Sequence, residues 1–452
     1  DVTTNTINEE FYLPTGCDSE SINYCNEMQV KFTNDDGSYT LYVRAYDEGM
    51  ALKYVDVTVA DAETVTVTYE YTNVDLPDTA ITEAFEICGT YESEYVTRTM
   101  ATIKRSSITL SAPVYADVNG YSVLITEAAV YNNDGEYASS GLKCGEILTW
   151  TPGLARDPDD EAKSILDSPG HIDLVEFDTV NGFSTPWRAV IVSNDTEEFV
   201  TTDMIAALND DPDEELFADT SWILPGSVAW SWWAEDGEQA NYDKHIEYID
   251  FAAENGWDYV TLDANWRYFE ERLAEMCEYA ESKGVGIFVW VNYYEIDTEE
   301  ERYELLSSWA EAGVKGIKAD YYESDEPEVL YAMQRTAEVA AEYKLMVIFH
   351  GCIRPGGETR TYPNVISYEA VQGEENHKWS SVPTVENCLI YPFTRNIVGP
   401  MDYTPICMPS GNGETAGFAI AKAIVYETGL PHFASAASIY SKWNGLSLLN
   451  NI

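Results

Sequence analysis

Two acidic segments in the second half of the chain carry side chains that could hydrolyse a glycosidic bond. Asp320 ends a strand-like run in which Val314, Ile317 and Ala319 are apolar. Glu369 follows the run 365–368, and Glu375 stands six positions later. Buried acids are costly unless they are paired or used, so acids at strand ends are candidates for chemistry. Hydrolysis of a sugar linkage needs two carboxylates, one to protonate the leaving oxygen and one to attack or to activate water.

Other polar and aromatic residues also follow the predicted strands, and together they form a candidate ring. A lone Asp in such a place is more often a helix cap, and a lone Trp is more often core packing. Their joint occurrence favours a sugar site, because acids cleave the bond and flat rings contact the C–H face of a sugar. The members of this ring are Trp232, Trp233, Asp263, Trp266, Asn292, Tyr293, Asp320, Tyr321, Tyr322, His350, Glu369, Glu375 and Arg395.

The first half of the chain, residues 1–222, reads as all-β. Apolar and polar residues alternate there with a period of two, and β-branched residues are frequent, both typical of strands. The sequence therefore predicts an N-terminal β-sandwich domain. The predicted strands are 39–46, 55–59, 65–71, 106–114, 121–126 and 187–192.

The second half, residues 223–452, alternates short apolar runs with helix-like segments. Thr298 and Glu301 have the spacing of a capping box, and Pro327 suits the first turn of another helix. This pattern predicts a (β/α)8 barrel, whose active site forms at the carboxyl ends of the strands. Gly-x-Gly-x-x-Gly follows none of these runs, so a dinucleotide site has no support. The predicted strands are 227–232, 259–262, 285–291, 314–319, 345–349, 365–368 and 389–393, with an eighth at about 432–436.

Composition excludes several kinds of partner. The formal net charge of −54 repels nucleic acid and anionic membranes, and no apolar run is long enough to span a bilayer. A solvated acidic coat explains most of this charge, and salt adaptation stays open. The eight cysteines form no Cys-x-x-Cys pair. Cys17 and Cys25 could close a local disulfide, so we expect an exported protein.

Several motifs together resemble glycoside hydrolase family 97 over most of the chain. The resemblance implies a β-sandwich followed by a barrel, hydrolysis of α-glycosides, and a calcium ion in the site. It also implies a further β-domain after the barrel, which we expect to be missing or truncated here. The matching segments are 228–233, 250–260, 262–263, 317–321, 350–351, 360–364, 393–395 and 399–405, with 185–188, 219–223 and, more weakly, 44–49.

The residue after His350 indicates which branch of the family the chain resembles. The inverting branch has a glutamate base at this place, but here it is Gly351. The resemblance therefore implies the retaining branch, whose members are typically α-galactosidases, with Asp320 as nucleophile and Glu375 as general acid and base. A retaining mechanism is physically consistent with these two roles. It requires the two carboxylates to stand about 5–5.5 Å apart, which leaves no room for an activated water between them.

The resemblance also implies the residues that hold calcium. Glu369 stands six residues before the acid, as the family's calcium ligand does, and the expected ligands are Glu127, Glu369 and Glu375. Clustered carboxylates suit calcium, which prefers hard oxygen ligands. Two alternatives stay open: Glu127 could be an ordinary strand carboxylate, and Glu374 could take the role of Glu375.

A further set of residues is expected to bind the sugar. Lys318 could assist Asp320 or simply be a solvated or bridging lysine, and the two histidines could bond sugar hydroxyls or support the site from behind. The expected substrate-binding residues are Trp232, Asp263, Lys318, His350, His377 and Arg395.

The leading hypothesis is thus a calcium-dependent, retaining exo-α-glycosidase, above all an α-galactosidase, that acts on oligo- or polysaccharides with a terminal α-linked sugar. An α-glucosidase is the alternative among enzymes, because one axial hydroxyl is distinguished by pocket geometry alone. A non-catalytic glycan-binding or surface protein on the same scaffold is the alternative of another class. An oligomer is possible, since a barrel end left open could need a partner chain.

Overall fold

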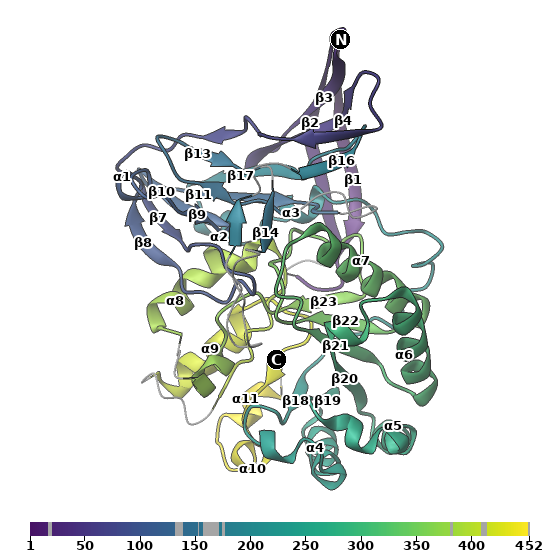
Figure 1. The fold of residues 1–452 in the computed structure, drawn as a ribbon. Helices are drawn as coiled ribbons and strands as arrows, with labels where there is room; N and C mark the ends of the chain where they lie inside the picture. The colour runs from purple at the N-terminus through teal and green to yellow at the C-terminus, as the bar shows by residue number, and fades with distance from the viewer. Residues whose placement is uncertain are drawn as a thin grey trace.

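The computed structural model describes residues 1–16, 20–131, 139–151, 153–156, 171–173, 177–379, 383–407 and 414–450. Figure 1 shows antiparallel sheets packed on one side of a parallel sheet that helices surround. This arrangement confirms the predicted order of a β-rich N-terminal part and a barrel-like C-terminal part. The domain boundary at residue 222 falls between the last antiparallel and the first parallel strand and stays a prediction.

The N-terminal part contains a sandwich of two antiparallel sheets. Buried side chains from both sheets, such as Val114 and Ile125 from one and Leu142 and Trp150 from the other, meet in one hydrophobic cluster. Two two-stranded ribbons and the short helices α1 (Met100–Ile103), α2 (Thr196–Val200) and α3 (Met204–Ala207) complete this part. Of the predicted strand 106–114, the middle pairs in β9 (Thr109–Leu110) and the last residue opens β10 (Val114–Val118).

The larger sheet of the sandwich has nine strands in the order β1 (Val2–Tyr12), β2 (Glu20–Thr33), β3 (Gly37–Ala45), β4 (Gly49–Val59), β17 (Trp187–Ser193), β11 (Tyr121–Ala128), β10 (Val114–Val118), β7 (Ile81–Ala84) and β8 (Val96–Thr99). The smaller sheet is β6 (Asn73–Val74), β13 (Leu148–Trp150), β12 (Leu142–Lys143) and β9 (Thr109–Leu110). The ribbons pair β14 (Leu154–Arg156) with β15 (His171–Asp173) and β16 (Phe177–Val180) with β5 (Thr64–Val67).

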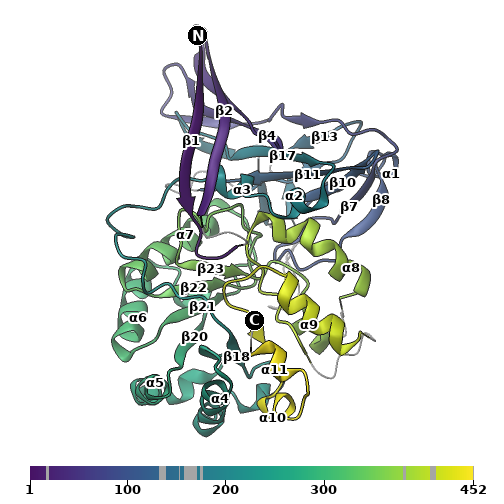
Figure 2. The same ribbon diagram turned by 180° about the vertical axis from the view of Figure 1, so that it is seen from behind.

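The C-terminal part is a curled parallel sheet of seven strands, which supports the predicted barrel. Its order is β23 (Val365–Tyr368), β22 (Met346–Phe349), β21 (Gly316–Asp320), β20 (Gly286–Asn292), β19 (Tyr259–Leu262), β18 (Val228–Trp230) and β24 (His432–Phe433). The helices are α4 (Tyr242–Asn255), α5 (Leu273–Ser282), α6 (Glu299–Ala312), α7 (Pro327–Glu342), α8 (Val385–Ile390), α9 (Ala416–Val425), α10 (Ala437–Tyr440) and α11 (Leu446–Leu449). Figure 2, from behind, shows α8 and α9 beside this sheet.

Local sequence signals set the ends of these helices. Thr298 caps α6 by accepting the N–H of Glu301, and α6 ends at Gly313, whose φ of 99° is a left-handed conformation that favours glycine. Pro327 opens α7, where its missing N–H costs nothing. The helices predicted at these two places are thereby confirmed.

The strand predicted at 389–393 is wrong. These residues end α8 and form the short helix η5 (Tyr391–Phe393). Five apolar residues do not distinguish a strand from a buried helix, and Pro392 inside the run lacks the N–H that a sheet ladder needs. In its place, Met401 makes a parallel bridge to Tyr368 of β23, at the gap between the two edges of the sheet.

Two smaller expectations concern the membrane and the cysteines. Within the described ranges, none of the helices has the length and apolar character needed to cross a bilayer. Cys25 is buried, and Cys17 lies outside the described residues, so their disulfide stays a prediction.

Candidate active site

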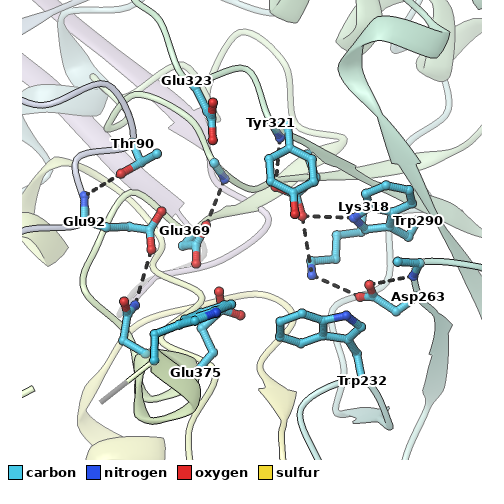
Figure 3. Close-up of a pocket in the computed structure, with 15 residues that line it drawn as sticks. Thr90, Glu92, Trp232, Asp263, Trp290, Lys318, Tyr321, Glu323, Glu369 and Glu375 are labelled. Atoms are coloured by element: carbon cyan, nitrogen blue, oxygen red, sulfur yellow. Dashed lines mark hydrogen bonds and ion pairs between the residues drawn. The ribbon is translucent and has the colours of Figure 1, made fainter. Parts of the chain in front are cut away.

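A pocket of about 330 Å³ lies at the carboxyl ends of the parallel strands, where a barrel places its active site. Figure 3 shows acids on one side, among them Glu92, Glu369 and Glu375, and Trp232, Asp263, Lys318 and Trp290 on the other. The residues that line the pocket are Thr90, Glu92, Trp232, Asp263, Ala264, Trp290, Lys318, Asp320, Tyr321, Glu323, Gly351, Glu369, Glu375, Asn376 and Trp379.

Lys318 joins two carboxylates on the pocket floor. Its Nζ lies 3.1 Å from Asp263 Oδ2 and 3.8 Å from Asp320 Oδ2, and the lysine is almost wholly buried. Burial works against the charged amine, but Asp263 and Asp320 together raise the pKa of Lys318. Asp263 also accepts a hydrogen bond from Trp230 Nε1 at 2.6 Å. The lysine is therefore a fixed cation beside Asp320, not a solvated surface residue.

Asp320 is held from two sides with one oxygen near the fixed cation. Trp290 Nε1 donates to its Oδ2 at 2.9 Å, and the N–H of Tyr321 donates to Oδ1 at 2.8 Å. Burial raises the pKa of Asp320, and the charges of Lys318 and His350 oppose this rise. Gly351 lies directly beside Oδ1, at a φ of 46°, and a Cβ at position 351 would come within 3.0 Å of that oxygen.

Glu369 is supported by a buried chain of histidines and a carboxylate. His350 Nδ1 lies 3.2 Å from Glu369 Oε2, and His350 Nε2 lies 2.8 Å from Asp402 Oδ2. The Asp402 carboxylate also contacts His432 Nδ1 at 2.5 Å. Burial opposes charge on His350, but the two acids raise its pKa well above the usual range. His350 thus fixes the orientation of Glu369 and lowers the pKa of that acid against the effect of burial.

Glu375 stands on the short helix η4 (Glu374–Trp379) and faces the pocket. Its N–H donates to Thr404 Oγ1 at 3.0 Å, and its carbonyl accepts from Trp233 Nε1 at 3.2 Å. Burial and the nearby charge of Glu369 raise the pKa of Glu375 well above the usual range. A carboxyl that keeps its proton near neutral pH can act as a general acid.

Glu374 points away from the pocket. Its carboxylate pairs with buried Lys422 and accepts the N–H of Cys407 at 2.8 Å. The structure thus gives Glu375, not Glu374, the pocket-facing position.

Glu92 is a pocket acid that the sequence did not single out. It belongs to the loop between β7 and β8 of the N-terminal part, and Asn376 Nδ2 donates to its Oε2 at 3.3 Å. Burial and the charge of Glu369 raise its pKa well above the usual range. The clustering of Glu92, Glu369 and Glu375 therefore leaves negative charge without full compensation.

Comparison with known proteins identifies the family. The family model described as Glycoside hydrolase 97 matches residues 222–371, and the model described as Glycosyl-hydrolase 97 N-terminal matches residues 1–211. This chain belongs to glycoside hydrolase family 97. The resemblance stated from the motifs is thereby confirmed.

Two curated relatives of this family 97 chain are named as galactosidases. A retaining α-galactosidase of Bacteroides thetaiotaomicron is 30% identical over 420 residues, which cover 85% of this chain and 62% of the relative. A probable retaining α-galactosidase of Streptomyces bingchenggensis is 29% identical over 444 residues, which cover 92% of this chain and 63% of that protein. The chain spans less than two thirds of the length of either relative.

Solved structures support the fold. A β-arabinopyranosidase structure matches with a TM-score of 0.82 and 24% identity, covering all of this chain and 76% of the other. A family 97 enzyme from Pseudoalteromonas sp. strain K8, solved with acarbose, also has a TM-score of 0.82, at 20% identity and 75% coverage of that chain.

Most of the predicted site residues of this family 97 chain meet at one pocket. They are Trp232, Asp263, Lys318, Asp320, Glu369 and Glu375. His350 lies behind them with both nitrogens engaged by acids, so it supports the site and does not contact the cavity. His377 lies outside the lining, and its nearest charges are Glu414 and Lys422.

Arg395, predicted to bind the sugar, is directed into the protein. Its guanidinium is buried and donates to main-chain carbonyls, including those of Ala370, Tyr368 and Pro400 at 2.9–3.1 Å. The prediction assumed that residues 389–393 form a strand that ends at the barrel mouth. Because these residues are helical, Arg395 does not face the mouth. The role of Arg395 is to hold the segments around β23 together.

Glu127, predicted to bind calcium, is not at the pocket. It lies in β11 between two buried arginines: Arg188 Nη1 is 2.5 Å from Oε2, and Arg354 pairs with Oε1. Ser139 Oγ and the N–H of Ser140 also donate to Oε1, at 2.9 and 3.0 Å. A carboxylate with both oxygens so engaged is not available as a ligand, whereas Glu92 of the N-terminal part lines the pocket.

The residues at the pocket fit a calcium ion. Glu369 Oε1 is buried without a hydrogen-bond partner, and Glu369 and Glu375 offer oxygens within 4.8 Å of each other and of His350. Glu92 adds a third carboxylate to the pocket lining but lies outside this closely spaced group, so its side chain would have to move toward Glu369 to complete the oxygen set that calcium prefers. A bound cation would compensate the negative charge that raises the pKa values of Glu92 and Glu375.

Proposed function

We propose that this chain is the catalytic part of a calcium-dependent retaining exo-α-galactosidase, with Asp320 as nucleophile and Glu375 as general acid and base. The observation that carries the proposal is the contact of Gly351 with Asp320. A Cβ at position 351 would lie only 3.0 Å from Asp320 Oδ1 and from the Tyr321 nitrogen, so this place offers little space for the base of an inverting enzyme. Asp320 itself is fixed, buried and paired with Lys318, as an attacking carboxylate should be.

The proposed reaction has two steps. First, an Asp320 oxygen forms a bond to the anomeric carbon while the glycosidic bond breaks, and Glu375 gives its proton to the departing oxygen. Then water attacks the same carbon, Glu375 takes a proton from it, and the bond to Asp320 breaks. Two inversions leave the released sugar with its original anomeric configuration.

The other residues of the pocket would support this chemistry. Lys318 lowers the pKa of Asp320 against the effect of burial, which favours the attacking carboxylate, and the pair of His350 with Asp402 holds Glu369 in one orientation. Glu92, Glu369 and Glu375 would hold the calcium ion, which supplies positive charge to offset charge that develops in the transition state. The pocket volume of about 330 Å³ is at the small end of ligand sites and supports removal of one terminal sugar at a time.

The choice of galactose rests on the names of the two curated relatives. The most direct test measures the hydrolysis of nitrophenyl α-D-galactoside, α-D-glucoside and β-L-arabinopyranoside, first with calcium present and again after chelation. We expect turnover of the galactoside in calcium and a large loss after chelation, reversed by added calcium. Preferred turnover of the glucoside would favour the α-glucosidase alternative.

Stereochemistry gives an independent test of retention. Proton NMR of the first product formed from the galactoside should show α-galactose before mutarotation. If β-galactose appears first, Asp320 is not a nucleophile. If no glycoside turns over in calcium, the non-catalytic glycan-binding alternative replaces the enzyme.

We also propose that the protein is exported from the cytoplasm. The acidic charge and the pair Cys17 and Cys25 support an extracellular, periplasmic or cell-surface location. Fractionation of the native source checks it, and recovery with cytoplasmic markers would contradict it.

A further inference from the structure

We propose that Trp379 and Trp232 form the binding surface for the leaving-group sugar, so that the natural substrate is an α-galactosyl oligosaccharide; this inference rests on the proposed function. Both side chains line the catalytic pocket; Trp232 follows β18, and Trp379 is the last residue of η4. Their ring centroids are 5.8 Å apart at an angle of 42°. The two rings thus form an open angled surface at the edge of the pocket.

The exposure of Trp379 distinguishes this surface from core packing. Trp379 is 45% exposed, whereas Trp232 stacks on the wholly buried Trp230 with centroids 5.4 Å apart. One ring is therefore anchored in the core and the other is open to a ligand. An aromatic face suits the C–H side of a pyranose ring, which is the apolar part of a sugar.

The acid indicates where the leaving group must lie. Glu375 and Trp379 belong to the same helix, η4. Asp320, in contrast, accepts a hydrogen bond from Trp290 of β20. In a retaining reaction the nucleophile attacks from the face opposite the departing oxygen, and the acid must reach that oxygen. The sugar attached through that oxygen is therefore expected on the side of η4, where Trp379 stands.

The surface is fixed before any ligand binds. Lys378 Nζ donates to the carbonyls of Trp232 at 3.1 Å and Trp233 at 2.6 Å, and it lies 4.5 Å from the centroid of the Trp232 ring. Trp233 in turn donates to the carbonyl of Glu375. These contacts tie η4 to the end of β18, so the acid and the two rings keep one relative position. Such preorganisation lowers the entropy cost of binding a second sugar.

A substrate pair separates this role from a general effect on catalysis. In α-galactosyl fluoride the leaving group is one atom and cannot reach Trp379, whereas α-galactosyl-(1→6)-glucose presents a full sugar. For Trp379→Ala we expect the ratio of kcat/KM for the disaccharide to that for the fluoride to fall roughly tenfold, the loss of one aromatic contact with a ligand. Trp379→Phe should restore part of this ratio.

Tyr268→Ala is the matched control. Tyr268 is an exposed aromatic residue, 77% accessible, beside a neighbouring hollow that Trp290 also lines. It stands on the nucleophile's side, so its replacement should leave the ratio unchanged. A fall in the ratio for Tyr268→Ala but not for Trp379→Ala would place the leaving group on the opposite side and overturn the inference.

Binding without turnover provides a second measurement. In the background of Asp320→Asn, calorimetry should show weaker binding of the disaccharide when Trp379 is also replaced, while binding of free galactose changes less. Equal losses for both sugars, or an unchanged kinetic ratio, would refute the inference and leave the proposed function intact. Failure of the wild-type protein to hydrolyse either substrate would instead remove the proposed function, and this inference with it.

Discussion

Replacing Glu127 by alanine should destabilise the protein and leave its affinity for calcium unchanged. Glu127 joins β11 to the barrel, because one of its oxygens pairs with Arg354 of the segment after β22. The alanine variant leaves Arg354 buried with few partners: its Nε has no hydrogen-bond partner, and its Nη1 makes one long contact of 3.4 Å to the carbonyl of Pro355. Arg188 is affected less, because Glu70 still pairs with it at 2.6 Å.

The size of the effect follows from the burial of this network. Glu127, Arg188 and Arg354 are all less than 4% exposed. Removing one partner of a buried ion pair costs about 3–5 kcal/mol, because the remaining charge stays in a poorly solvated place. At about 2–4 °C for each kcal/mol in a domain of roughly 200 residues, Tm should fall by roughly 10 °C.

Two measurements on three variants test this reasoning. Thermal unfolding and calcium titration calorimetry are compared for Glu127→Ala and Glu92→Ala, with Glu127→Gln as a milder variant that keeps the shape of the side chain. We expect Glu127→Ala to lower Tm with unchanged calcium affinity, and Glu92→Ala to weaken calcium binding with a small change in the Tm of the calcium-free protein. If Glu127→Ala instead abolished calcium binding and kept its Tm, the placement of both residues would be refuted.

Three further predictions concern catalysis. Asp320→Ala should lower kcat for nitrophenyl α-galactoside by roughly 10³-fold or more, and azide should restore turnover with β-galactosyl azide as product; undiminished activity would contradict its role as nucleophile. Gly351→Ala should lower kcat far more than it lowers Tm, because its Cβ displaces Asp320 Oδ1; a variant with normal kcat would show that this contact is unimportant. The pH profile of kcat/KM should be bell-shaped. Activity should fall as pH drops through the pKa of Asp320, which burial raises, and as pH rises through the pKa of Glu375, which burial raises even where calcium offsets the charge of Glu369. Glu375→Gln should therefore remove the alkaline limb.

The part of the site on strand ends could be predicted from the sequence. Asp263, Asp320 and Glu369 each follow a short apolar run, and parallel strands bring such positions to one edge of the sheet. The same rule did not determine side-chain direction. His350 also follows a strand, yet it turns toward Glu369 and Asp402 because two buried acids attract its charge.

The seventh strand position could not be predicted, because its local signal is weak. Residues 389–393 have the apolar character of a strand and fold as helix, while Met401 contacts β23 through a single bridge. A bridge of one residue has no periodicity to detect. The predicted role of Arg395 in sugar binding is wrong for the same reason, because its expected position at the barrel mouth depended on that strand.

Glu92 could not be found from spacing, because its position depends on how the two halves of the chain pack. It lies in a loop without strand periodicity, and the loop is fixed by contacts to the barrel on both sides of it. Tyr91 Oη donates to Asp325 Oδ2 at 3.1 Å, and the N–H of Tyr95 donates to Asn387 Oδ1 at 2.7 Å. Glu127, by contrast, lies in a regular strand, where burial beside arginine gives it a structural role. Glu92 therefore reaches the pocket on a loop that the barrel itself holds in place, which makes the packing of the two parts a condition for the calcium site that we propose.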